Sequence, residues 1–224
     1  MKIKPIIFGS TGMIGQGVLR ECLIDPEVES VLLVNRRPSG NKDPKIKEVI
    51  HKDFSDFSSL GNIVKDYNAC FFSLGITSVG LSEEEYYKTT FELTIKVAEM
   101  LVRYNKNITF CYISGQGTDS SEKGKIMWAR VKGKTENALL KMPFKNAYMI
   151  RPGYIQPRNG IRSRTKLYNI VYFFFTPLYY ILKPFKSIVT DTRSLGKAMI
   201  SLAKNGYNKM LIEVPDINKL ANRD

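Results

Sequence analysis

Three glycines near the start of the chain have the spacing of a phosphate-binding turn. Gly9, Gly12 and Gly15 follow an apolar run and open a helix-like segment in "IIFGSTGMIGQGV". In such a turn the first glycine permits the tight bend, the second lets the backbone approach a pyrophosphate, and the third lets helix pack on strand. The helix N-terminus then faces the anion. The strand-turn-helix context predicts a dinucleotide site rather than a glycine turn without a ligand. Its turn contacts are Gly9, Thr11, Gly12, Met13, Ile14 and Gly15.

The residues after the second apolar run distinguish between the two common dinucleotides. NAD-selective sites usually place a carboxylate there for the ribose 2′-OH, whereas an arginine suits a 2′-phosphate. Here the sequence reads Asn35-Arg36-Arg37 and has no acidic residue before Asp43. Two guanidiniums that can bind a phosphate bidentately favour NADP(H) over NAD(H). The alternative is a pair of surface arginines in a basic protein.

Other chemistries have little support in the sequence. Cys22, Cys70 and Cys111 stand far apart without a CxxC pair, so neither a disulfide framework nor a metal site is indicated. The single histidine, His51, cannot anchor a multi-histidine metal site or the usual serine-hydrolase triad. The uncharged stretch 167–182 is shorter than the roughly 20 residues of a spanning helix. The N-terminal apolar run is too short for a signal peptide. We therefore expect a cytoplasmic, soluble protein.

The elements that would position these residues alternate along the chain. A capping box at Ser82 and Glu85 marks the clearest helix. Continuous apolar strands alternating with helices are typical of a parallel sheet covered on both faces. We predict an α/β fold, a Rossmann-type doubly wound parallel sheet with helices on both faces. The expected strands are 3–8, 31–34, 48–50, 69–74, 108–113 and 147–150, and the expected helices lie near 13–24, 56–66, 82–104 and 125–141.

The pattern changes after about residue 153. An Arg/Pro-rich stretch and an aromatic run precede a helix-like segment near 192–204 and a short apolar run, "MLIEV". We expect one NAD(P)-binding domain over 1–224, with a small C-terminal cap on the substrate side at 154–190.

Seven motifs occur in an order that resembles the short-chain dehydrogenase/reductase superfamily. They are "GSTGMIG", "NRR", "HKDF", "FFSLGIT", "YISGQGT", "WARVKGKTE" and "RPGYIQPR". The resemblance covers nearly the whole chain and is strongest to the atypical branch. That branch includes NmrA-like and Tat-interacting-protein-like members and small nucleoside-diphosphate-sugar epimerase-like proteins. It implies that Asp53 and Phe54 line the adenine, and that Leu74 and Gly75 lie along the ribose and phosphates.

The same resemblance implies a second group of contacts around the nicotinamide. Ser114 occupies the place of the substrate-orienting serine, and Lys132 would hold the nicotinamide ribose hydroxyls. Pro152 and Gly153 would begin the loop whose backbone meets the carboxamide.

Two residues depart from the superfamily pattern. Trp128 stands where the catalytic tyrosine belongs, four residues before Lys132, and Thr90 stands where many members carry a proton-relay asparagine. An indole N–H is only a hydrogen-bond donor, so Trp128 can fill the pocket or stack on the nicotinamide but cannot be the general acid/base. We expect dinucleotide binding with hydride transfer that is weak, altered or absent. The alternative is that Trp128 is an ordinary aromatic residue of its helix.

Several other residues could take over the proton transfer. Tyr86, Tyr87, Tyr112 and Tyr154 lie close in sequence to predicted active-site loops, although each also suits a core position. Asp119 could relay a proton, or could be a turn residue in "GTDSSEKG".

The chain is strongly basic, with 34 Lys+Arg against 21 Asp+Glu and a formal net charge of +13. Such a balance favours anionic partners without choosing among them. The basic and aromatic segment 158–185 suits an anionic, partly apolar small substrate, a membrane interface or single-stranded nucleic acid. A core-facing helix with flanking charges is the alternative that dense aromatic segments favour. We expect an atypical reductase or epimerase-like enzyme with a small-molecule substrate, or a non-catalytic dinucleotide-binding regulatory protein. A membrane- or nucleic-acid-associated basic protein ranks last, because no docking motif for either occurs.

Overall fold

The structure is a computed structural model that describes residues 2–161 and 188–223. Most of the expected cap, 154–190, and of the basic-aromatic segment lies outside the described residues. No helix in the described part of the chain is both long enough and apolar enough to cross a membrane.

The core of the molecule is a seven-stranded parallel sheet with the strand order β3-β2-β1-β4-β5-β6-β9. All six strand pairs are parallel. The reversal of strand order beside β1 is the topological switch point at which α/β sheets bind ligands. The strands are β1 Pro5–Phe8, β2 Val31–Asn35, β3 Ile46–Ile50, β4 Ala69–Phe72, β5 Thr109–Ile113, β6 Asn146–Arg151 and β9 Leu211–Glu213.

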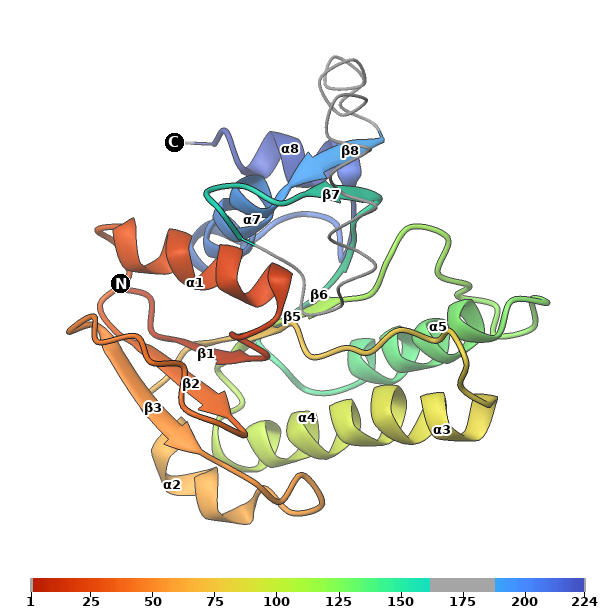
Figure 1. Cartoon of the computed structure of the whole chain (residues 1–224), viewed down its shortest axis with the longest axis horizontal. Helices are drawn as coiled ribbons and strands as arrows, with labels where there is room; N and C mark the ends of the chain where they lie inside the picture. The colour runs from red at the N-terminus through yellow and green to blue at the C-terminus, as the bar shows by residue number, and fades with distance from the viewer. Residues whose placement is uncertain (1, 162–187, 224) are drawn as a thin grey trace.

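Helices cover both faces of this sheet (Figure 1), as the strand and helix pattern predicted. One layer contains α1 Met13–Ile24, α7 Thr192–Asn205 and α8 Val214–Leu220. The other contains α2 Gly61–Val64, α3 Glu83–Tyr87, α4 Leu93–Tyr104 and α5 Met127–Leu140. Alternate residues of the buried strands feed two apolar cores: Ile7 and Phe71 belong to one, and Ile6 and Cys70 to the other. This alternation explains why the strands read as continuous apolar runs.

The expected helix at 82–104 is confirmed with one difference. Its capping box joins Ser82 and Glu85 reciprocally, but a π-helical turn, η2 at Lys88–Glu92, separates α3 from α4. The hydroxyl of Thr94, in the first turn of α4, donates to the carbonyl oxygen of Thr90 in this turn, at 2.5 Å. The apolar spacing of the sequence did not reveal the turn, because one extra residue shifts a helical pattern only slightly.

The short elements were partly missed. Residues 56–66 form a 3₁₀ turn, η1 Ser58–Leu60, followed by α2. A second sheet of two parallel strands, β7 Tyr154–Gln156 and β8 Val189–Asp191, lies beside the main one. α8 begins directly after β9 with Pro215 in its first turn.

Candidate functional site

The glycine turn lies between the end of β1 and the start of α1. Gly9 has a φ of +86°, and a Cβ there would lie 2.8 Å from the backbone nitrogen of Leu74. A Cβ at Gly15 would overlap the carbonyl oxygen of Gly9, so α1 contacts the turn directly. Among the described residues no side chain caps the N-terminus of α1. The first N–H groups of α1 are therefore left at the C-terminal edge of the sheet, where a phosphate could accept from them.

An open cavity of about 590 Å³ adjoins the glycine turn. It lies at the switch point, where the turn meets the ends of β2 and β4 and the segment after β3. Every lining residue except Val34 is a predicted cofactor contact. The lining consists of Gly9, Thr11, Val34, Asn35, Arg36, Arg37, Phe54 and Leu74.

Two exposed arginines supply positive charge to this cavity. The guanidinium carbon of Arg36 lies 5.7 Å from the centroid of the Phe54 ring. That ring in turn stacks on His51, with centroids 5.9 Å apart and an interplanar angle of 22°. Neither Arg36 nor Arg37 forms an ion pair within the part of the chain that the structure describes. Both charges are therefore available to an anionic ligand.

The remaining predicted contacts of the adenosine half lie outside the cavity lining. Gly12 caps α1, and Met13, Ile14 and Gly15 form its first turn. Asp53 is exposed, and its carboxylate accepts from the N–H and the hydroxyl of Ser55 at 2.8 and 2.5 Å. These bonds lower the pKa of Asp53. Its contact with an adenine therefore stays a prediction, as does that of the exposed Gly75.

Sequence reasoning missed one polar network at the end of β2. The amide oxygen of Asn35 accepts from the hydroxyl of Ser10 at 2.9 Å, and its Nδ2 donates to Glu48 Oε1 at 2.8 Å. The backbone N–H of Ser39 donates to the same carboxylate oxygen at 2.9 Å. Glu48 lies in the edge strand β3, and only the pairing register of that strand brings it beside β2.

Ser114, Lys132 and Trp128 form a second cluster, at the end of β5 and the start of α5. Ser114 is only 5% exposed, and its hydroxyl donates to the carbonyl oxygen of Ile150 at 3.1 Å. The ammonium group of Lys132 donates to the carbonyl oxygen of Ser114. Burial lowers the pKa of Lys132 to about 8, an effect that nearby Glu136 opposes.

The indole of Trp128 lies against the loop that follows β5. A Cβ on Gly117 would be 3.7 Å from the Trp128 ring, and one on Gly115 would be 3.9 Å from it. The structure therefore brings together the three residues that the resemblance assigned to the reaction centre; that Trp128 replaces the catalytic tyrosine stays a prediction.

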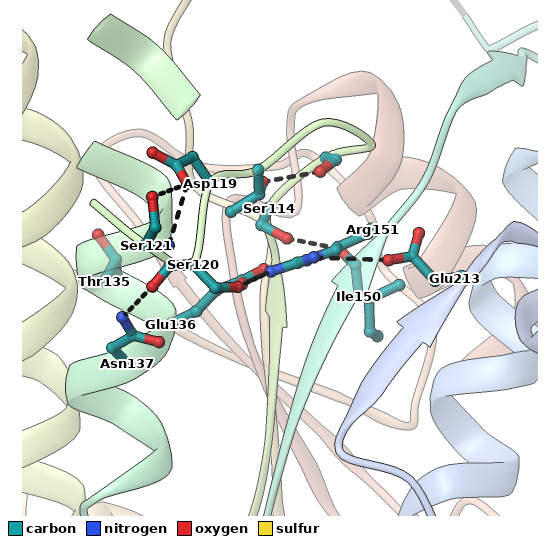
Figure 2. Close-up of polar contacts among 12 residues, drawn as sticks. Ser114, Asp119, Ser120, Ser121, Thr135, Glu136, Asn137, Ile150, Arg151 and Glu213 are labelled. Carbon is teal, nitrogen blue, oxygen red and sulfur yellow. Dashed lines mark hydrogen bonds and ion pairs between the residues drawn. The ribbon is translucent and has the colours of Figure 1, made fainter. Parts of the chain in front are cut away.

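The loop after β5 is fixed to α5 along its length (Figure 2). The backbone N–H of Asp119 donates to the carbonyl oxygen of Ala129 at 3.1 Å. Gly133 permits this contact, because a Cβ there would overlap the Asp119 carbonyl oxygen. The side chain of Asn137 donates to the carbonyl oxygen of Ser120 at 2.9 Å. This loop is therefore a rigid wall of the site.

A buried ion pair between Glu136 and Arg151 contacts the same loop. Glu136 is fully buried and accepts from Arg151 Nε at 3.0 Å and from Nη2 at 2.5 Å. Arg151 also donates to the hydroxyl of Ser120 at 2.6 Å and lies 3.5 Å from the Glu213 carboxylate (Figure 2). The guanidinium thus connects α5, β6, β9 and the loop that begins at Ser114.

The residues considered as substitutes for the missing tyrosine are mostly engaged in structure. Tyr86 and Tyr112 are buried in the core, and burial raises the pKa of both phenols. Tyr154 is half-buried, with its hydroxyl donating to Gln156 Oε1 at 2.8 Å. Tyr87 is half-buried and stacks on Phe91.

Asp119 is a turn residue. Its carboxylate accepts from Ser121 and from the N–H of Gly124, and these bonds lower its pKa.

The segment after β6 closes the site on the far side. Pro152 is buried, and its carbonyl oxygen accepts from the N–H of Gln116 at 2.9 Å. A Cβ on Gly153 would lie 2.5 Å from Gln116 Oε1 and 2.6 Å from the carbonyl oxygen of Ile188. The predicted carboxamide loop is therefore in contact with the loop that carries Ser114.

This fold, with its glycine turn at the switch point, is that of a Rossmann-type dinucleotide-binding protein. Residues 6–124, more than half of the chain, match the NAD dependent epimerase/dehydratase family, and the chain belongs to that family. This assignment confirms the expected superfamily.

Two fungal proteins illustrate the distance to curated relatives. The chain is 23% identical over 167 residues to the mitochondrial protein fmp52-2 of Aspergillus terreus, covering 74% of this chain and 72% of that protein. It is 26% identical over 157 residues to the mitochondrial protein FMP52 of Meyerozyma guilliermondii, covering 68% of this chain and 65% of that one, less than two thirds of its length.

Solved structures share the fold at low sequence identity. Gre2 of Candida albicans, in complex with NADPH, has a TM-score of 0.69 at 15% identity, covering 94% of this chain and 77% of that one. The Bordetella bronchiseptica enzyme WbmF, in complex with NAD+, has a TM-score of 0.66 at 14% identity, covering 99% and 78%. Since one structure holds NADPH and the other NAD+, the shared fold does not decide between the two dinucleotides.

Proposed function

We propose that this protein binds NADP(H) at the C-terminal edge of its sheet. The supporting observation is the cavity in which the glycine turn meets Arg36 and Arg37. The helix N-terminus suits a pyrophosphate, and the two guanidiniums suit a ribose 2′-phosphate. Phe54 lines the same cavity and would contact the adenine.

The nicotinamide half of the ligand would lie along the second cluster. Lys132 would hold the ribose hydroxyls, and Pro152 and Gly153 would meet the carboxamide. A bound nicotinamide supplies a hydride donor or acceptor. The chain's own residues would have to move the accompanying proton, and Trp128 cannot do so. Positioned proton transfer typically contributes about 10²–10⁴-fold to a rate.

Two functions are compatible with such a site. The first is an atypical short-chain reductase or epimerase-like enzyme that acts on an unknown small substrate, with slow or altered hydride transfer. The second is a non-catalytic, dinucleotide-responsive regulatory protein. The bonds of Ser114 to Ile150 and of Lys132 to Ser114 favour the second, because both polar groups are already engaged within the protein.

The first test is a calorimetric titration of the purified protein with NADPH and with NADH. We expect tighter binding of NADPH, and the preference should disappear in an Arg36→Gln/Arg37→Gln variant. Equal or tighter binding of NADH by the unaltered chain would contradict the NADP(H) proposal. The single tryptophan gives an independent readout, because a nicotinamide beside Trp128 should quench its fluorescence.

Replacing Trp128 with tyrosine separates the two functions. If the rest of the reaction centre is competent, Trp128→Tyr creates or raises NADPH-dependent reduction of small carbonyl compounds, and Trp128→Phe is the control. Dinucleotide binding without activity in either variant would favour the regulatory function. Robust turnover by the unaltered chain that disappears in Tyr154→Phe would instead show that Tyr154 replaces the missing acid.

Three further expectations complete the proposal. The chain forms one domain with a substrate-side cap at 154–190. It belongs to the NmrA-like and Tat-interacting-protein-like branch of the superfamily. Its ligand besides the dinucleotide is a small molecule for which an anionic group is favoured, with no specific nucleic acid; peripheral contact with a membrane is the less favoured alternative. Its location is the cytoplasm, which imaging of the tagged protein in its native cell would test. Localisation to mitochondria, the compartment in the names of two relatives, would contradict it.

A further inference from the structure

The carboxylate of Glu48 lies beside the end of β2, where we propose that a 2′-phosphate binds. The residues that follow β2 in the sequence include no acidic residue before Asp43. β3 pairs with β2 in parallel, with Glu48 opposite Leu33 and Ile50 opposite Asn35. From this register the Glu48 side chain reaches the strand end, where Oε1 accepts from Asn35 Nδ2 at 2.8 Å. Asn35 itself lines the cavity, so the carboxylate is one side chain behind the lining.

The bonds of Asn35 and Glu48 connect the glycine turn, the end of β2 and the loop that follows β2. Asn35 is fixed on one side by the hydroxyl of Ser10, in the glycine turn, at 2.9 Å. The N–H of Ser39, in the loop that carries the two arginines, donates to Glu48 Oε1 at 2.9 Å on the other side. The Glu48 carboxylate is therefore bound both to a residue that lines the cavity and to the loop that carries Arg36 and Arg37.

The charge of Glu48 is not neutralised by an ion pair. No lysine or arginine pairs with it within residues 2–161 and 188–223. The side chain is half-buried, so solvent screens its field only in part. A 2′-phosphate carries negative charge and would be repelled, whereas the neutral 2′-OH of NAD(H) would not.

We infer that Glu48 is a specificity-determining residue of the dinucleotide site. Its carboxylate lowers the affinity for NADP(H) relative to NAD(H) and so limits the preference that Arg36 and Arg37 create. This inference rests on the proposed NADP(H) site. It assigns to β3 the acidic group that NAD-selective sites usually carry at the end of the second strand.

The test is the Glu48→Gln variant, which removes the charge and keeps an oxygen that can accept from Asn35 and Ser39. For unit charges several ångströms apart in a partly screened site, we expect NADPH to bind about threefold to tenfold more tightly. NADH affinity should change less than about twofold, and the NADPH gain should shrink at high ionic strength. Glu48→Ala removes the same charge by truncation and serves if the glutamine variant folds poorly, as judged by thermal unfolding.

A matched control separates local charge from net charge. Glu29→Gln removes one carboxylate that pairs with Lys4 at 2.8 Å, at the opposite end of β2, and should leave both affinities unchanged. If the unaltered chain binds NADPH through Arg36 and Arg37 but Glu48→Gln leaves its affinity unchanged, the inference about Glu48 is wrong and the proposed function stands. Equal gains for both dinucleotides, or an equal gain in Glu29→Gln, would also refute it. If the unaltered chain binds neither dinucleotide, the proposed function fails and the inference fails with it.

Discussion

Replacing Arg151 with methionine should be one of the most destabilising single changes in the chain. Glu136 is fully buried and accepts two hydrogen bonds from this guanidinium, at 3.0 and 2.5 Å. Removing one partner of such a pair leaves an uncompensated buried charge, which typically costs about 3–5 kcal/mol. A domain of this size is stable by only about 5–15 kcal/mol, so the variant should lose at least about a fifth of its free energy of unfolding.

Urea denaturation at neutral pH measures this loss as a lower midpoint at unchanged slope. The control is Arg103→Met, at an exposed position on α4, which should stay within about 0.5 kcal/mol of the unaltered protein. The double variant Glu136→Gln/Arg151→Met removes both charges and should be more stable than Arg151→Met alone, by about 1–2 kcal/mol. If the free energy of unfolding of Arg151→Met lies within about 1 kcal/mol of that of the unaltered chain, the ion pair does not stabilise the fold as expected.

Two further predictions concern the site. Gly15→Ala should destabilise the protein and abolish dinucleotide binding, because its Cβ would overlap the Gly9 carbonyl oxygen. Gly12→Ala should fold normally, because its Cβ would lie 3.4 Å from the same oxygen. Calorimetry distinguishes the two variants. The unfolded chain binds more protons at Lys132 than the folded one between pH about 8 and about 10.5, so stability should rise across that window. Lys132→Met should remove this rise, which is about 2–3 kcal/mol for a pKa lowered from 10.5 to about 8. Urea midpoints at both ends of the window measure it, and an identical rise in both proteins would contradict it.

The layers of the fold were predictable because each strand is covered on both sides. Burial on both faces forces a continuous apolar run, and such runs at 31–34 and 69–74 correspond to β2 and β4. The helix boundaries at 13–24 were also predictable, since a glycine turn precedes α1. By contrast, β7 and β8 have three residues each, too few for a pattern to emerge. The π-helical turn η2 keeps the helical composition of its neighbours and could not be distinguished from them.

The residues that line the cavity were easier to predict from the sequence than the polar residues that hold them in place. Gly9 and Arg36 directly follow β1 and β2, Phe54 lies four residues after β3, and the ends of parallel strands meet at one edge of the sheet. Glu48 gave no such signal, since a charged residue in an edge strand usually faces solvent. The pairing of Arg151 with Glu136 was equally hidden, because it joins the end of β6 to the middle of α5.

The two halves of the site differ in whether their polar groups already bond within the protein. Around the glycine turn, neither guanidinium has an ion-pair partner and no side chain caps the α1 N-terminus within the described residues, so an anion there gains contacts without breaking an ion pair. Around Trp128 the opposite holds: Ser114 and Lys132 already bond to main-chain carbonyl groups, and the indole covers the adjoining loop. A ligand that recruits Lys132 must first replace its bond to Ser114. Affinity for a dinucleotide should therefore come mainly from the adenosine half. This division supports the proposed regulatory function over the proposed enzymatic one.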